Sequence, residues 1–102
     1  MYNKSVLIEY DAIKDQFNQE KHGLSLAQAG LLDWSTALIR ADTRYDYSEA
    51  RYQALGLLDM RVHLAAFTVR DDALRIISLR RANRREERRY EEARIADKLT
   101  GR

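Results

Sequence analysis

The chain has 102 residues, of which 45% are hydrophobic and 33% charged, and its formal net charge is +2. This composition is ordinary for a globular domain and excludes a disordered chain, and no apolar run approaches the roughly 18 to 20 residues that span a bilayer. The absence of cysteine excludes disulfides, thiolate nucleophiles and most zinc sites. We expect one domain over residues 1–102. A strand-like segment follows Met1 in place of a signal region, so we also expect a cytoplasmic protein.

The first elements are a strand and a helix. The apolar run Ser5–Tyr10 predicts a short strand. Asp11 is a suitable N-cap for a helix that ends at Gly23, the residue type that best adopts a left-handed C-terminal conformation. Ile13 and Phe17, four residues apart, predict the buried face of this helix.

A second helix is predicted directly afterwards. Ser25 and Gln28 have the spacing of a capping box, which marks a helix start. Its buried stripe is expected at Ala27, Leu31 and Trp34, which follow the α-helical period.

The remaining chain changes to short strands and then a final helix. Four strands are predicted, at Ala37–Arg40, Glu49–Leu58, Arg61–Arg70 and Ala73–Arg80, with a polar loop over 41–48 and turns at Asp59–Met60 and Asp71–Asp72. Hairpins this short favour an antiparallel meander. With a last helix at Ala82–Leu99 the order is βααββββα. This predicts an α+β fold with an antiparallel four- to five-stranded sheet, two N-terminal helices on one face and a C-terminal helix packed nearby.

Arginine is concentrated where the last strand meets the last helix. Residues 75–90 read RIISLRRANRREERRY, with seven arginines and two glutamates, a local charge of +5 against +2 for the whole chain. Guanidinium groups on rigid elements suit phosphate recognition by both charge and shape. Arginine is also enriched by genomic G+C content alone, so the position of these residues is more informative than their number.

Four segments together resemble one protein family. They are KHG at 21–23, DYSEARYQALG at 46–56, RIISLRRA at 75–82, and the Glu86/Glu87 to Tyr90 stretch that follows. In this order and spacing, over about residues 8–92, they resemble the BrnT family of bacterial type II toxins. One departure is Leu79, where the family has a small residue, usually alanine. If this position lines the groove, leucine would narrow it and weaken the toxin.

The resemblance implies a fold, an activity and partners. The expected fold is that of RelE-like ribonucleases, and the expected activity is RNA cleavage that inhibits translation. The implied partners are mRNA, on the ribosome or free, and a BrnA-like ribbon-helix-helix antitoxin through which operator DNA is contacted. A dimeric antitoxin would give a hetero-oligomer. No cofactor, metal or membrane is implied.

Metal-independent RNA cleavage requires a base for the 2′-OH, a cation for the phosphate and an acid for the leaving oxygen. Arg80, at the end of the last strand, is the first candidate for the cation, and Arg75 the second. By strand alternation the two lie on opposite faces, so both reach one phosphodiester only if the strand is bulged or ends by residue 79. Either arginine is alternatively a structural ion-pair partner.

His22 is the first candidate for proton transfer. It lies in the last turn of a helix, where the macrodipole favours the imidazolium form and hence an acid. The alternative is a histidine that only satisfies a helix carbonyl. Lys21, beside it, is expected either to point its ammonium group at RNA or to lay its methylenes over the core.

Further residues are expected around this site. Candidates for RNA contact are Arg81, Arg84, Arg51 and Tyr90, and Tyr90 is equally compatible with the core. Glu49 is expected to orient Arg51, and Asp46 to cap the loop. His63 is expected in the core, and no spacing of residues predicts a metal site. The alternative function is a non-catalytic nucleic-acid-binding or regulatory module that uses the same basic surface.

Overall fold

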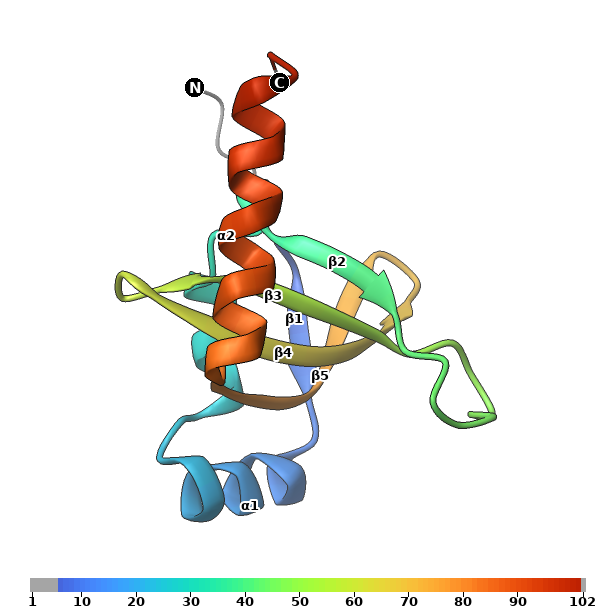
Figure 1. The fold of residues 1–102 in the computed structure, drawn as a ribbon. Coiled ribbons are helices and arrows are strands. Elements are labelled where there is room, and N and C mark those ends of the chain that lie inside the picture. Colours follow the sequence, from blue (N-terminus) through green and yellow to red (C-terminus); the bar gives the residue numbers. More distant parts are fainter. Residues whose placement is uncertain (1–5, 102) are drawn as a thin grey trace.

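A computed structural model describes residues 6–101 (Figure 1). Its elements are β1 (Ile8–Tyr10), α1 (Ala12–His22), the 3₁₀ helices η1 (Leu26–Leu31) and η2 (Trp34–Thr36), β2 (Leu38–Ala41), β3 (Tyr52–Leu58), β4 (Arg61–Arg70), β5 (Ala73–Arg81) and α2 (Arg84–Leu99). The α+β class is as predicted. The order is not, because two 3₁₀ helices replace the second α-helix. Ser5, where the first strand was predicted to begin, lies outside the described residues.

The sheet is mixed. Its strand order is β1-β5-β4-β3-β2, in which β2 to β5 form an antiparallel meander and β1 pairs with β5 in parallel. The prediction of the meander is confirmed, and that of a purely antiparallel sheet is wrong. The side chains of a short apolar strand alternate in the same way whether the strand pairs in parallel or antiparallel. The sequence of β1 therefore did not indicate the direction in which it pairs with β5.

Both predicted hairpin turns are present. Leu58 pairs with Arg61, leaving Asp59 and Met60 as a two-residue turn with φ of 54° and 66°. Two positive φ values are typical of a type I′ turn, whose twist matches that of the flanking strands. In the second hairpin Asp71 has φ of 53°, which aspartate tolerates better than most residues.

A bulge interrupts β5. Ser78 pairs with Ala66 and Ile76 pairs with Phe67, so Ile77 is an extra residue on β5. An extra residue reverses the alternation of side chains beyond it. Paired residues in a sheet point to the same face. Arg75 and Arg80 pair with Thr68 and Leu64, which are four residues apart on β4. The two arginines therefore lie on one face of the sheet.

The two faces of the sheet are covered by different elements. On one face η1 contributes Leu26 and Ala29 to the main core, and Leu32 follows directly after it; on the other, Tyr90 of α2 packs against Leu55, Val62 and Leu64 (Figure 1). The predicted stripe of Ala27, Leu31 and Trp34 is wrong, since Ala27 and Leu31 are exposed and Trp34 is half-buried. A 3₁₀ helix has three residues per turn, so its buried residues recur at every third position.

The ends of α1 follow the prediction, but its buried face does not. The Asp11 carboxylate accepts from the Lys14 amide at 3.0 Å, and Gly23 ends the helix with φ of 72°. Ile13 and Phe17, predicted to be buried, are 64% and 66% exposed. The buried residue of α1 is Asn18. Within residues 6–101 no helix is long and apolar enough to cross a membrane.

Asn18 joins α1 to the end of β5. Its amide donates to the Leu79 carbonyl at 2.9 Å and its oxygen accepts from the Leu79 amide at 3.0 Å. The same amide also donates to the Leu24 carbonyl at 2.8 Å. β1 pairs only with residues 74–76 of β5. The Asn18 side chain therefore takes the place of a neighbouring strand at Leu79.

We expect Asn18→Ala to lower the free energy of unfolding by about 3 kcal/mol, because it leaves the buried amide and carbonyl of Leu79 without partners. Asn18→Asp should be similarly destabilising, since a carboxylate can accept from Leu79 but cannot donate to it. Urea denaturation measures both. Gln16→Ala, an exposed change on the same helix, is the control. Stabilities equal to the control would contradict the structural role of this contact.

Candidate functional site at the sheet–helix junction

Arg80 is held by a carboxylate at the start of α2. Its Nη1 and Nη2 donate to Glu86 Oε1 and Oε2, each at 2.9 Å, and Nη1 also donates to the Arg81 carbonyl at 3.2 Å. Glu86 is itself fixed by a capping box with Asn83, in which each backbone amide donates to the other residue's side chain at 2.9 Å. The hydrogen bonds from Arg80 are the main cause of the lowered pKa of Glu86. Arg80 is therefore oriented by the same residues that begin the helix.

Two of the five N–H groups of the Arg80 guanidinium are without a partner in the described part of the chain. The bonds to Glu86 and Arg81 use both Nη1 hydrogens and one Nη2 hydrogen. The Nε hydrogen and the second Nη2 hydrogen have no partner within residues 6–101. They form one edge of the planar group, and a pair of parallel N–H bonds is the geometry that binds phosphate in a bidentate manner.

His22 lies close enough to Arg80 for the arginine charge to act on it. Partial burial is the largest cause of a lowered His22 pKa, followed by the charges of Lys21 and Arg80. This direction is opposite to that expected from the helix dipole. The imidazole is therefore neutral near pH 7 and suits a base better than an acid. Lys21 itself is exposed, on the same last turn of α1.

Arg75 belongs to a second group of residues, at the other end of β5. Its Nη1 donates to Glu9 Oε2 of β1 at 2.8 Å. It borders a hollow of about 170 Å³ with Lys14, Tyr47, Ser48, Glu49, Arg51, Thr68, Arg70 and Ile77. The side chain of Arg51 makes no hydrogen bond or ion pair in the described part of the chain. Its buried Nε and the buried hydroxyl of Thr68 are both unpartnered there.

Arg75 and Arg80 share a face but not a position. Their partners on β4 are four residues apart, which at the rise of a strand separates the two arginines by roughly 13 Å. Each is also drawn toward its own carboxylate, Glu9 or Glu86. The bulge therefore brings both arginines to one face of the sheet, as contact with a shared phosphodiester would require. Their separation and their different ion-pair partners nevertheless hold the two guanidinium groups in different places.

Two expected contacts in the 42–51 loop are replaced by others. Glu49 pairs with Arg70 at 3.0 Å and not with Arg51, whose guanidinium carbon lies 4.1 Å from the centre of the Tyr47 ring. The loop is capped by Asp42 and not by Asp46, which is exposed and makes no hydrogen bond among the described residues. The cluster of tyrosines and arginines at 44–51 is the sequence feature that could have indicated these loop contacts.

Tyr90, His63 and Leu79 are core residues. Tyr90 is 5% exposed and its hydroxyl lies 3.3 Å from Thr36 Oγ1, so its ring offers no face for a base to stack on. His63 is buried, with Nδ1 2.8 Å from the Arg61 carbonyl, which confirms the prediction. Leu79 is fully buried in the core on the face opposite Arg80. It therefore does not narrow a groove on the face of the sheet that carries Arg75 and Arg80, which we call the arginine face.

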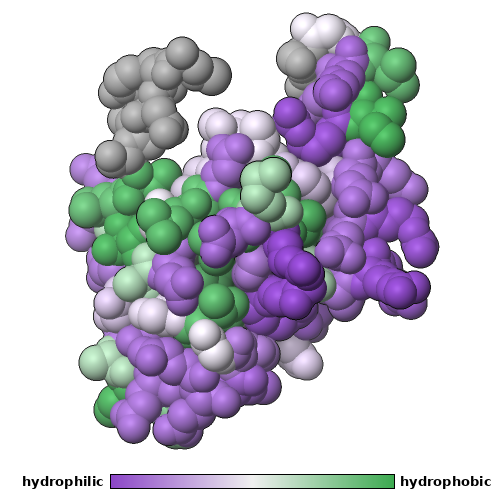
Figure 2. All heavy atoms as spheres, turned by 90° about the vertical axis from the view of Figure 1, so that its left-hand side faces the viewer, coloured by the Kyte–Doolittle hydropathy of each residue, from purple (hydrophilic) through white to green (hydrophobic). Residues whose placement is uncertain are grey.

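A basic rim surrounds the first turn of α2. Arg81, Arg84, Arg85 and Arg88 are exposed, and their side chains form no ion pair within the described residues. Hydrophilic side chains dominate the surface beside the lower part of α2 in Figure 2. Cations in the first turn of a helix oppose its macrodipole at a cost of about 0.3–1 kcal/mol each. A bound anion would reverse that cost.

The chemistry of the site is that of arginine, lysine and histidine. Across the described range no three His, Asp or Glu side chains gather as metal ligands would. Positive groups on the arginine face, a neutral imidazole and a free guanidinium edge suit an anionic substrate that is attacked with proton transfer.

Comparison with known proteins agrees with this chemistry. No curated protein matches the chain. Residues 10–86 match the family model described as the ribonuclease toxin, BrnT, of type II toxin-antitoxin systems. The match covers most of the chain, including α1, the whole sheet from Tyr10 onward, and Arg80 with Glu86. The chain thus belongs to the BrnT family of ribonuclease toxins, whose systems pair each toxin with an antitoxin.

Proposed function

We propose that the chain is a metal-independent endoribonuclease that cleaves mRNA in the cytoplasm and so inhibits translation. The observation that carries this proposal is the Nε/Nη2 edge of Arg80, which has no partner among residues 6–101 and is oriented by Glu86, together with the lowered pKa of His22, on which the Arg80 charge acts. Family membership supports the ribonuclease activity.

In the proposed mechanism His22 removes the proton from the ribose 2′-OH. The oxygen then attacks the adjacent phosphorus, and the bond to the 5′ oxygen of the next nucleotide breaks. Arg80 stabilises the charge that grows on the phosphate oxygens, which is commonly the largest contribution in such reactions. We assign protonation of the leaving oxygen to Lys21, the cation next to His22. The distant Arg75 and Arg51 then bind the RNA chain and take no part in the reaction.

The partner is proposed to be a BrnA-like ribbon-helix-helix antitoxin, through which the complex contacts operator DNA. The basic rim of α2 is a suitable surface for an acidic antitoxin segment, because its arginines have no ion-pair partners among residues 6–101. A dimeric antitoxin would bind two toxin chains. Such contacts would weaken as salt concentration rises.

A non-catalytic module is the second candidate. The observation in its favour is that Arg75 and Arg80 both hold carboxylates, as structural arginines do. Expression of the chain alone in bacteria discriminates the two: a nuclease arrests growth, and a regulatory module does not.

Arg80→Ala should reduce the rate of RNA cleavage about 10²- to 10³-fold, the usual effect of losing one donor to a developing oxyanion. Arg80→Lys should recover only part of it, since lysine keeps the charge but not the planar edge. The assay is cleavage of a labelled RNA in EDTA. Arg81→Ala, which removes the same charge one residue later, is the control and should mainly raise KM. Loss of parent activity in EDTA would overturn the metal-independent mechanism.

Cleavage should fall as pH decreases through the lowered pKa of His22, because only the neutral imidazole accepts a proton. The acidic limb of the rate profile should therefore lie below about 6.5, the ordinary value for histidine. Lys21→Met removes a cation that lowers this pKa, so its limb should move to higher pH whatever its maximal rate. Single-turnover rates between pH 4.5 and 8 give the profiles. An unchanged acidic limb in His22→Gln would remove His22 from the reaction.

A further inference from the structure

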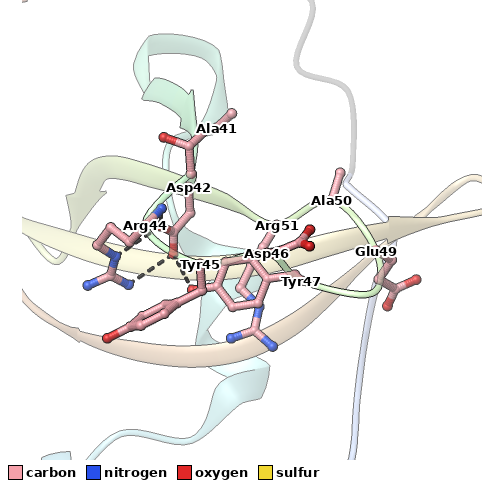
Figure 3. A pocket seen from close by; sticks show the side chains of 10 residues that line it. Ala41, Asp42, Arg44, Tyr45, Asp46, Tyr47, Glu49, Ala50 and Arg51 are labelled. Atoms are coloured by element: carbon pink, nitrogen blue, oxygen red, sulfur yellow. Dashed lines mark hydrogen bonds and ion pairs between the residues drawn. The ribbon is translucent and has the colours of Figure 1, made fainter.

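A hollow of about 490 Å³ is formed by the loop between β2 and β3, outside the proposed cleavage centre. It is lined by Ala41 at the end of β2 and by residues 42–47 and 49–51 of that loop (Figure 3). From its chemistry we propose that it binds a nucleobase of single-stranded RNA, stacked on Tyr45. This inference rests on the proposed ribonuclease function and identifies where a base of its substrate is held.

The loop is fixed before any ligand arrives. The buried Asp42 carboxylate accepts from the backbone amide, Nε and Nη2 of Arg44, at 3.2, 2.9 and 2.9 Å, and from the Tyr47 hydroxyl at 3.0 Å. These bonds hold the pKa of Asp42 well below its usual range, with the Arg44 side chain as the main cause. A surface that is already ordered loses less conformational entropy on binding.

Two aromatic rings of the loop pack against each other, each with an arginine nearby. Tyr45 and Tyr47 meet edge to face, with ring centres 5.8 Å apart and planes at 77°. The guanidinium carbon of Arg51 covers the Tyr47 ring at 4.1 Å, and that of Arg44 lies 5.8 Å from the Tyr45 ring centre. Figure 3 shows these four side chains projecting to the same side of the loop. Aromatic rings beside arginines are the usual means of holding unpaired bases.

A purely structural role accounts for only part of this arrangement. Arg44 and Tyr47 satisfy the buried Asp42, so the fold needs them. Tyr45 is 68% exposed, and its hydroxyl has no partner within the described range. An exposed ring of this size gains little stability for the fold, whereas stacking on a base buries it.

The position of the hollow also favours RNA. Tyr47, Glu49 and Arg51 border both this hollow and the smaller one that contains Arg75 and Thr68. The two hollows are therefore neighbours on the arginine face of the sheet. Arg51 lies at their junction with its donors unpartnered among residues 6–101, where it can contact the phosphate of the nucleotide whose base stacks on Tyr45.

The test uses binding without cleavage. A fluorescent 2′-O-methyl RNA oligonucleotide of mixed sequence has no free 2′-OH and cannot react, and an oligonucleotide of the same length with abasic residues removes only the bases. Tyr45→Leu should weaken binding of the intact oligonucleotide about tenfold, the usual effect of losing one base–aromatic stack. It should leave binding of the abasic one unchanged. Tyr45→Trp should restore parent affinity, and Tyr10→Leu, on the opposite edge of the sheet, is the control.

Parent affinity of Tyr45→Leu for the intact oligonucleotide would overturn the proposal, as would an equal loss for both oligonucleotides. Weakened binding of the antitoxin alone would instead make the hollow a protein-docking surface and also overturn it. The result is independent of catalysis. If Tyr45 discriminates intact from abasic RNA while the parent cleaves no RNA, the base site stands and the nuclease proposal fails.

Discussion

The side chain of Asn18 makes the contact on which the candidate site depends. β1 pairs with β5 for only three residues, so the backbone of Leu79 would otherwise end unpaired beside the core. Asn18 offers one donor and one acceptor in the spacing of a neighbouring strand, and it binds both groups of Leu79. The same side chain joins α1 to the strand residue that precedes Arg80, so one buried amide pairs the end of β5 and attaches the helix that carries His22.

The planar guanidinium group of arginine can stabilise the fold with some of its donors and keep the others for a ligand. Arg80 gives one edge of its guanidinium to Glu86 and keeps the other, so the ion pair orients it without using all its donors. Arg75 is held by Glu9 on a neighbouring strand, while Arg51 stacks on Tyr47 and keeps its polar atoms free of other residues in the described part of the chain. Only a planar group with five donors can divide its contacts in this way.

The arginines at the start of α2 give this region positive charge at a cost in helix stability. Arg84 and Arg85 occupy the first turn, where the helix dipole disfavours cations, and the capping box of Asn83 and Glu86 offsets part of that cost. Glu86 both caps the helix and neutralises Arg80. The arginines that remain give this end of the molecule the electrostatic character that an RNA phosphate or an acidic segment of a partner would meet.

The sequence alone determined the elements whose signals are local. Asp11, Gly23 and Ser25 occupy the cap positions predicted for them, and the turn residues at 59–60 and 71–72 set the hairpins. The last helix begins at Arg84, after its N-cap Asn83, and not at Ala82, where it was predicted to begin. The ordered motifs of the sequence also pointed to the family. The sequence could not predict the direction of a side chain where contacts between residues far apart along the chain decide it.

The parallel direction of β1, the exposure of Ile13 and Phe17, and the burial of Asn18 all follow from how α1 meets β5. The bulge at Ile77, which brings Arg75 and Arg80 to one face, arises from pairing with β4. Desolvation and neighbouring cations, not the helix dipole, set the direction of the His22 pKa. These are properties of residues far apart along the chain, and only the tertiary structure brings them together.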